Sequence, residues 1–413
     1  MLHICRVYKP DYIYMYMSAE ILEYHKKDNR YIYCLDKLYA SLGKPYEYTL
    51  IERESLNDVQ IFDYFYSEYR SIIQNIMSIM EDDDRLLLNV SSGTPAMKSG
   101  LLVIATMGEY PCTAIQVVTP AKKMNEHSHE GYDVELAWEC DVDNEPDYVN
   151  RCHEVKCPSL LLIKQQEMIN TLVRKYDYSG ALEIADSIKT AQLSSKIELI
   201  RMGQARYQLD IAAAKRIADK YNIDLFPVKS GDQQRLFEYA LNLCLKVIKG
   251  DNVDFIRGLS PFIADIYEVA LGKLCGIKID DYVTYKYGVR RWDRQKLSGT
   301  RLEEVLKCKW QDFRYENIYS SQLVELILAE ESLKPEIKES LSELRLIEER
   351  IRNLAAHEIV SVTDTVIQKK TGYASSQIVK LIKKTFRNVG FNYPDIYWNS
   401  YDQMNEHICN IIT

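Results

Sequence analysis

The residues best suited to acid–base and phosphate chemistry lie close together near the end of the chain. Arg352 and Asn353 are adjacent, and His357 follows four residues after the asparagine. On a helix, Asn353 and His357 share one face, whereas Arg352 lies about 140° from His357 around the axis. One helix therefore assembles the three side chains poorly. Two copies related by a twofold axis would form one cleft that contains both sets.

These residue types fit one reaction, the cleavage of RNA without a metal ion. A histidine, whose pKa is ordinarily near neutrality, can take the proton of the 2′-hydroxyl and protonate the leaving 5′-oxygen. Arg352 can make bidentate contacts to phosphate, and Asn353 can position the phosphate or orient His357. The products would be a 2′,3′-cyclic phosphate and a 5′-hydroxyl. The alternative is that His357 is an ordinary surface or interfacial histidine.

A second candidate site follows the apolar run of residues 86–90. Three hydroxyl residues and Gly93 lead into a helix at Pro95, with Lys98 one turn further on. In an open parallel sheet this loop lies at the carboxyl ends of the strands, where ligands bind. Free N–H groups at the helix start, the hydroxyls and Lys98 favour an anion. The alternative is that Thr94 only caps the helix and Ser92 makes the turn.

The site lacks the known nucleotide fingerprints. The chain contains neither G-x-x-x-x-G-K-[ST] nor G-x-G-x-x-G, which argues against a P-loop ATPase and a dinucleotide oxidoreductase. The loop is therefore predicted to sense a phosphate-bearing ligand.

The elements that position these sites change in character near residue 155. Before it, short apolar runs alternate with helical patterns, which predicts a parallel sheet with helices on both faces. Predicted strands are 12–17, 47–51, 86–90 and 112–119, predicted helices are 19–41, 61–80 and 96–109, and residues 132–140 are predicted to form an extended arm. After residue 155 the strand signal disappears and helical spacing dominates up to residue 389. The predicted fold class is thus an α/β domain followed by an all-α domain, joined near the acidic stretch 141–147.

Composition narrows the function further. The 413 residues include 52 basic and 60 acidic side chains, a net charge of −8. This argues against a broad basic face for nucleic acid, although not against a small local one. No apolar run is long enough to span a membrane, and no signal peptide is recognisable. The ten cysteines are scattered, and Cys152, His153 and Cys157 lack the second half of a zinc site. We expect reduced thiols, no metal, no cofactor and a cytoplasmic location.

Both candidate sites resemble motifs of known families. Arg352-Asn353-x-x-x-His357 resembles the R-x(4–6)-H motif of HEPN ribonucleases. Residues 89–97, Asn-Val-Ser-Ser-Gly-Thr-Pro-Ala-Met, resemble the N-x-[ST]-[SG]-G-T-x-x-M motif of CARF domains, the Rossmann-like sensors of CRISPR systems. This order resembles that of the type III-A accessory ribonucleases called the Csm-six family. Further similarity around residues 118–126 and 132–139 points to its streptococcal and enterococcal branch.

The resemblance implies a homodimer in which paired CARF domains bind a cyclic oligoadenylate, the second messenger made by the type III effector complex. Binding would activate degradation of single-stranded RNA at the HEPN cleft, without metal. The expected ring is cyclic hexa-adenylate, and some members slowly degrade it, for which Thr94 is the position to suspect. The implied catalytic residues are Arg352, Asn353 and His357. The implied ring-binding residues are Asn89, Ser91, Ser92, Gly93, Thr94, Pro95, Met97, Lys98, Thr119 and Asn125.

The implied domains are a CARF sensor over 1–145, a helical linker over 146–190 and a HEPN domain over 191–413. Family members begin with a strand and a loop ahead of the first helix. Residues 1–4 already resemble that helix, so we expect the first strand to be missing and activator binding to suffer.

Two alternatives stay open. The first is a ligand-responsive regulatory or binding protein without nuclease activity. Its nucleic-acid contact would be the helix at 375–389, where Lys380, Lys383, Lys384 and Arg387 form a basic patch; a solvated helix face is the commoner explanation of such a patch. Stable DNA binding is not expected. The second is a structural dimer with an inactive HEPN site, against which the intact motif at 352–357 argues.

Overall fold

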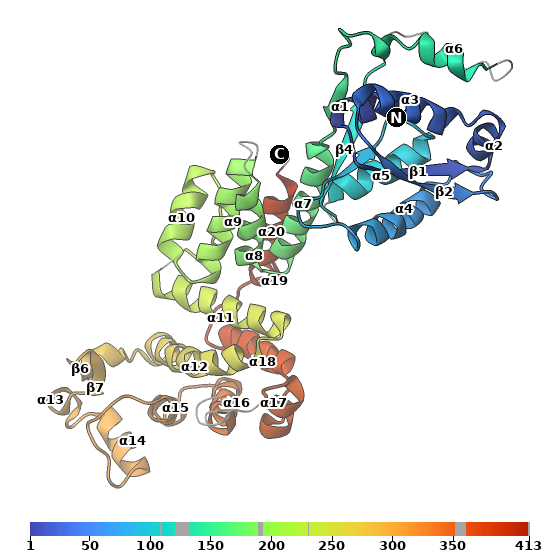
Figure 1. Cartoon of the computed structure of the whole chain (residues 1–413). Coiled ribbons are helices and arrows are strands. Elements are labelled where there is room, and N and C mark those ends of the chain that lie inside the picture. Colours follow the sequence, from blue (N-terminus) through green and yellow to red (C-terminus); the bar gives the residue numbers. More distant parts are fainter. Residues whose placement is uncertain (108–109, 120–131, 189–192, 230, 352–360, 412–413) are drawn as a thin grey trace. The chain divides into compact units, whose positions relative to one another are not determined.

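The computed structural model describes residues 1–107, 110–119, 132–188, 193–229, 231–351 and 361–411. They divide into two compact units, Met1–Lys164 and Gln165–Thr413 (Figure 1). In the described residues, no helix is both long and apolar enough to cross a membrane.

The strands of the first unit form two small sheets. Strands β1 (Tyr12–Ser18) and β2 (Glu47–Arg53) pair in parallel along their whole length. Strand β3 (Leu86–Asn89) pairs in parallel with β4 (Cys112–Val117). The short β5 (Cys152–Glu154) pairs antiparallel with β4. The predicted parallel pairing is confirmed, and the strands divide into two sheets, because no ladder joins β1 or β2 to β3 in the described residues.

Helices cover both faces of β1, as the alternation of strands and helices along the chain predicts (Figure 1). Ile13, Met15 and Met17 are buried in a core with the first three helices. Tyr16 points to the other face, where its ring meets the ring of Phe65 on α4. The helices of this unit are α1 (Leu2–Tyr8), α2 (Ala19–Asp28), α3 (Arg30–Leu42), α4 (Phe62–Met77), α5 (Pro95–Met107) and α6 (Val134–Glu139).

Polar side chains set two helix ends that the hydrophobic pattern misses. The predicted single helix over 19–41 is divided at Asn29, which has a left-handed φ of 54°, a conformation that asparagine tolerates. The carboxylate of Asp28 accepts the backbone N–H of Arg30 there. The predicted extended arm at 132–140 is instead helix α6, because Asp133 accepts two backbone N–H groups of its first turn and so caps it.

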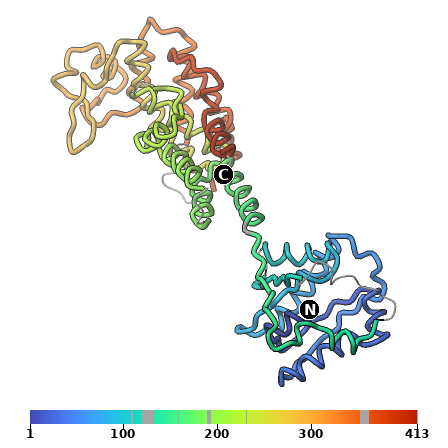
Figure 2. Tube along the Cα trace, turned by 90° about the horizontal axis from the view of Figure 1, so that it is seen from above, coloured from blue at the N-terminus to red at the C-terminus, as the bar shows by residue number. Residues whose placement is uncertain are grey.

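The second unit is built almost entirely of helices around one continuous core. Helix α7 (Pro158–Arg174) contains the division between the units. The last helix, α20, returns to pack against α9 (Figure 2). The remaining helices are α8 (Tyr178–Ser187), α9 (Ser194–Tyr207), α10 (Ile211–Lys220), α11 (Gly231–Lys249), α12 (Asn252–Cys275), α13 (Arg294–Leu297), α14 (Arg301–Lys309), α15 (Ser320–Leu328), α16 (Pro335–Ile351), α17 (Asp364–Thr371), α18 (Ser375–Asn388), α19 (Asp395–Trp398) and α20 (Ser400–Asn410).

A β-hairpin interrupts this helical unit, so the prediction that strands end near residue 155 is wrong. Strands β6 (Val283–Lys286) and β7 (Val289–Trp292) pair antiparallel. The two residues between them, Tyr287 and Gly288, have φ angles of 52° and 76°. Two consecutive positive φ angles close a two-residue hairpin turn whose twist suits the strands.

A buried ion pair joins three helices in the core of the second unit. The guanidinium of Arg206 on α9 donates to both carboxylate oxygens of Glu238 on α11, at 2.8 and 2.9 Å. The two side chains are 0% and 1% exposed. Arg206 also donates to the hydroxyl of Ser400, the first residue of α20, at 2.8 Å, and lies 4.2 Å from the ring centre of Tyr401. The pair therefore fixes α9, α11 and α20 to one another.

Candidate functional site

The loop after β3 is folded by its own polar side chains. Asn89 accepts the backbone N–H of Ser91 at 3.0 Å and donates to the hydroxyl of Ser92 at 3.2 Å. The hydroxyl of Ser91 accepts the backbone N–H of Val117, at the end of β4, at 2.6 Å. Three of the predicted ring-binding residues are thus brought together at the carboxyl ends of two parallel strands, where the hydroxyl-bearing Ser92 is exposed.

Thr94 attaches this loop to the segment after β2. Its hydroxyl donates to the carbonyl of Val59 at 2.6 Å and accepts the backbone N–H of Met97 at 3.3 Å. The hydroxyl of Thr94 therefore caps the start of α5 and also fixes the loop to Val59. No sequence pattern identifies Val59, because the contact spans 35 residues and depends on how two loops meet.

The turn that leads into α5 requires a glycine at residue 93. The N-terminus of α5 lies next to the loop that follows β3. Gly93 has a φ of 99°, and a Cβ atom there would lie 3.1 Å from the sulfur of Met97. Met97 therefore packs under the turn. Gly93 and Pro95 are exposed, and Lys98 is half-buried. The first N–H groups of a 13-residue helix and a nearby ammonium group favour an anion at this place.

The end of β4 is held by a buried polar network. Thr119 is exposed just beyond β4, and its neighbour Val118 exchanges hydrogen bonds with Arg151, N–H to carbonyl at 3.1 Å and guanidinium to carbonyl at 3.0 Å. The guanidinium of Arg151 binds both oxygens of Asp143, at 2.5 and 2.9 Å. His3 donates to Asp143 at 2.8 Å, and its other ring nitrogen accepts the N–H of Arg151.

The pKa of Asp143 reflects this network. Burial raises the pKa of the carboxyl group, but the hydrogen bonds from Arg151 and His3 outweigh burial and hold the pKa below its usual range. The charged form is therefore the one that supports the strand end beside Thr119. Asn125, the last of the predicted ring-binding residues, lies outside the described residues.

The predicted catalytic residues, Arg352, Asn353 and His357, also lie outside the described residues. The helix that leads to them, α16, is described as far as Ile351. Apolar residues recur along it at steps of three or four and form a buried stripe. Ile337 is half-buried, and the other members are at most 1% exposed: Leu341, Leu344, Ile347 and Ile351. The helix packs against α12, α15, α17 and α18.

The last turns of α16 are fixed from two sides. The buried Glu348 accepts from the hydroxyl of Ser320 on α15 at 2.7 Å and from Arg345 at 2.8 Å. Arg350 donates to the carbonyl of Thr371, the last residue of α17, at 2.9 Å. The segment with the predicted catalytic residues therefore starts from a helix end that its neighbours hold in place, as precise catalytic geometry requires.

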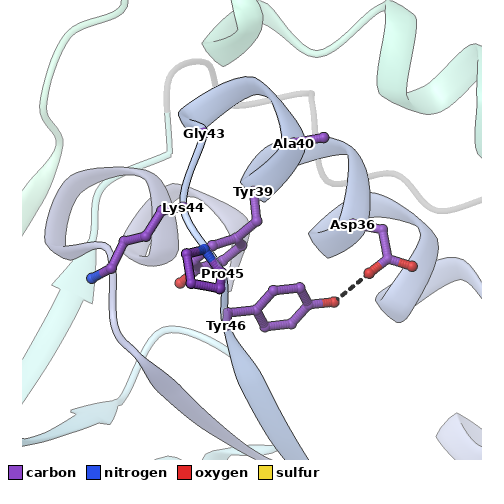
Figure 3. Close-up of a pocket in the computed structure, with 7 residues that line it drawn as sticks. All are labelled: Asp36, Tyr39, Ala40, Gly43, Lys44, Pro45 and Tyr46. Atoms are coloured by element: carbon purple, nitrogen blue, oxygen red, sulfur yellow. Dashed lines mark hydrogen bonds between the residues drawn. The ribbon is translucent and has the colours of Figure 1, made fainter.

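A shallow hollow of about 450 Å³ elsewhere in the first unit belongs to neither site. It lies where α3 ends and β2 begins (Figure 3). The candidate site instead follows the carboxyl ends of β3 and β4. Tyr46 donates to Asp36 at 2.7 Å and stacks on Tyr39, so the lining groups bind one another. Among the residues that the structure describes, no three His, Cys, Asp or Glu side chains are grouped to hold a metal ion.

Comparison with known families matches three domain models along the chain. The Cas_Csm6 CARF domain matches residues 47–152, the CRISPR-associated protein Csm6 6H domain matches 155–207, and the Cas_Csm6 HEPN domain matches 225–409. The two domains that the motifs predict, CARF and then HEPN, are both confirmed in that order.

Full-length relatives carry the same family name. The "CRISPR system endoribonuclease Csm6" of Mycobacterium tuberculosis is 29% identical over 99% of this chain and 93% of the relative. The Csm6′ endoribonuclease of Streptococcus thermophilus is 27% identical over 74% of this chain and 77% of the relative. A solved structure, Enterococcus italicus Csm6 bound to cyclic hexa-2′-fluoro-hexa-dAMP, has a TM-score of 0.63, with 17% identity over 100% of this chain and 95% of that one. This last likeness confirms the fold.

Proposed function

The chain belongs to the Csm6 family of CRISPR-associated proteins, and from this premise we propose that it is an endoribonuclease activated by a cyclic oligoadenylate. The observation that carries the proposal is the ordered set of CARF, 6H and HEPN domains, with a recognisable motif in each of the two outer ones. The matched relatives are named endoribonucleases.

In the proposed reaction the HEPN residues cut RNA without a metal ion. His357 takes the proton of the attacking 2′-hydroxyl or protonates the leaving 5′-oxygen, a contribution of about 10²–10⁴-fold for each such transfer. Arg352 stabilises the charge that develops on the non-bridging phosphate oxygens, and Asn353 positions the phosphate. The bond between phosphorus and the 5′-oxygen breaks as the 2′-oxygen bonds to phosphorus. The products are a 2′,3′-cyclic phosphate and a 5′-hydroxyl.

The cleavage site is proposed to form between two copies of the chain. On an ideal helix Arg352 and His357 would lie about 140° apart, so a twofold arrangement would supply the arginine and the histidine that a single copy would not bring together. Within each copy, the contacts of the last turns of α16 with α15 and α17 would hold the start of this segment in place.

The activator is proposed to bind the loop over residues 89–98 together with Thr119 and Asn125. The N-terminus of α5, the exposed Ser92 and Lys98 suit the phosphates of a ring. The solved relative bound to a cyclic hexa-dAMP analogue favours a ring of six adenylates. Since the hydroxyl of Thr94 is engaged by Val59 and Met97, its first role is to shape the loop. Comparing the rate of ring degradation by the native chain and by a Thr94→Ala variant measures whether Thr94 takes part in slow degradation of the activator.

The proposed setting is type III-A antiviral defence in the cytoplasm. The effector complex supplies the ring, single-stranded RNA is the substrate, and neither DNA nor a membrane is a stable partner. The proposed division is a sensor over 1–145, a helical linker over 146–190 and the nuclease over 191–413. Switching requires that the ring bind one dimer arrangement more tightly than another.

The test of the catalytic assignment is the variant His357→Ala, with His407→Ala as its matched control. His407 is an exposed histidine of the same HEPN domain. In EDTA, with the ring present, the native chain and His407→Ala should yield fragments ending in a 2′,3′-cyclic phosphate. His357→Ala should yield none while it still forms dimers and binds the ring. Equal cleavage by His357→Ala, or fragments with a 3′-hydroxyl, would disprove the assigned chemistry.

A further inference from the structure

One stretch of the HEPN domain has a charge opposite to that of the whole chain. Residues 365–394 contain six basic side chains and neither Asp nor Glu, in a protein of net charge −8. The stretch comprises most of α17, all of α18 and the turn that follows. Its basic residues are Lys369, Lys370, Lys380, Lys383, Lys384 and Arg387.

Three of these basic residues lie on one side of helix α18. Its apolar side is buried against α16, α11 and α17, through Ile378, Leu381, Ile382 and Phe386. Lys380, Lys384 and Arg387 follow one another at steps of four and three, which places them within about 60° around the helix axis. All three are exposed. We call these three residues the α18 basic face; Lys383 lies at its border, against the ring of Trp398.

The α18 basic face is not neutralised by the described part of the chain. None of its three cations has an ion-pair partner among the described residues. Other surface cations of the same unit do pair, such as Lys220 with Glu198 at 2.5 Å and Lys309 with Glu325 at 2.8 Å. Three unpaired cations over about 10 Å of helix therefore create a local positive potential that attracts a negatively charged polymer.

The contacts of α16 show how α18 lies relative to the end of α16, the helix that leads to the predicted catalytic residues. Asn388, at the end of α18, donates to the hydroxyl of Ser340 near the start of α16 at 2.9 Å. At the other end of α16, Arg350 binds Thr371, four residues before α18 begins. The two helices therefore run antiparallel, and α18 starts next to the point where α16 leads into residues 352–357. Its basic face begins at Lys380, about 8 Å along α18 from Ser375, and ends at Arg387, about 18 Å from Ser375.

We propose that the α18 basic face binds the phosphates of the single-stranded RNA substrate that flank the cut site. This rests on the proposed function, since it names the path of the same substrate. Lysine and arginine on a helix surface release counterions from a nucleic-acid backbone without reading its sequence. The face therefore contributes affinity along the strand and no base preference. Duplex DNA is the competing class of partner.

The test removes the three charges and leaves the helix intact. The variant is Lys380→Gln, Lys384→Gln, Arg387→Gln. The control variant, Lys175→Gln, Lys215→Gln, Arg216→Gln, removes the same charge from exposed residues of the same unit. Binding is measured by fluorescence anisotropy with a 20-nucleotide 2′-O-methyl RNA, which cannot be cut through its 2′-oxygen. A DNA duplex of equal length is measured beside it.

The α18 variant should bind the RNA on the order of tenfold more weakly. The slope of log Kd against log salt should be shallower by about 2, because each phosphate that the three side chains neutralise adds about 0.7 to that slope. In cleavage of unmodified RNA its KM should rise while kcat stays near that of the native chain. The control variant should match the native chain in both assays.

If the native chain cleaves RNA and the α18 variant keeps the native affinity and salt slope, the inference is overturned and the proposed function stands. A native chain that never cleaves RNA, yet binds it through the α18 basic face, would overturn the nuclease and keep the inference. Tighter binding of the DNA duplex through the same three residues would refute RNA as the partner.

Discussion

Removing the carboxylate of Glu238 should destabilise the second unit severely, and the structure supports an estimate of how much. Arg206 is 0% exposed, and Glu238 supplies two of its charge-assisted hydrogen bonds, at 2.8 and 2.9 Å. Burial lowers the pKa of Arg206, but Glu238 outweighs burial, so the net pKa lies above its ordinary value. Arginine stays charged in proteins. Glu238→Gln therefore leaves a buried cation without its counter-charge: Ser400 and a single amide oxygen can still accept from Arg206, whereas the amide NH2 group is a donor and faces another donor.

Breaking a buried ion pair from one side costs about 3–5 kcal/mol. In hydrogen exchange this corresponds to a loss of protection of roughly two to three and a half orders of magnitude. The loss should appear in peptides of α9, α11 and α20, the helices that the pair joins. Peptides of the first unit, which form a separate compact body, serve as the internal reference.

Two further variants separate a charge effect from a packing effect. Glu183→Gln changes an exposed carboxylate on α8 of the same unit and should leave protection unchanged. Arg206→Met with Glu238→Leu replaces both charges by apolar groups, which is often neutral or stabilising, so protection should return. Normal protection in Glu238→Gln, or a double variant that is worse than the single one, would refute the reasoning.

Two predictions concern the sensor domain. Thr94→Val removes the hydrogen bonds to Val59 and to the helix start, so ring binding measured by calorimetry should weaken while Thr94→Ser stays near native; equal affinity of all three chains would exclude the loop-shaping role. Because the pKa of Asp143 is held below its usual range by Arg151 and His3 against the effect of burial, its contribution to stability is present above about pH 4 and is lost as the pH falls through the lowered pKa. Urea unfolding of the first unit should therefore show a steeper loss of stability on the acid side of pH 4 in the native chain than in Asp143→Asn, and parallel curves for the two would contradict it.

Local sequence patterns predict a helix or strand of this protein well where one face of that element is buried. Alternation identifies β1, since Ile13, Met15 and Met17 are buried on one side. Spacing of three and four identifies α16, whose stripe lies in the core. The errors come from single polar or left-handed residues. Asn29 divides a helix and Asp133 starts one, because capping and turn chemistry override hydrophobic periodicity over a few residues.

The support of the candidate sites could not be predicted, because it depends on long-range contacts. The bond from Thr94 to Val59 joins residues 35 apart, and the bond from Arg151 to His3 joins residues 148 apart. The Arg206–Glu238 pair likewise cannot be predicted from the sequence of one helix, because its residues lie on α9 and α11. Sequence motifs identify which residue types a site uses, whereas the groups that hold those residues in place follow only from tertiary packing.

The most direct test of the central claim is the cleavage of a fluorogenic single-stranded RNA in EDTA, with no ring, with cyclic tetra-adenylate and with cyclic hexa-adenylate. We expect a large increase in the rate with the hexa-adenylate ring and loss of that increase in His357→Ala. Activation by the tetra-adenylate ring alone would contradict the proposed ring size. RNA that stays intact under all three conditions would contradict the claim that this chain is a ring-activated ribonuclease.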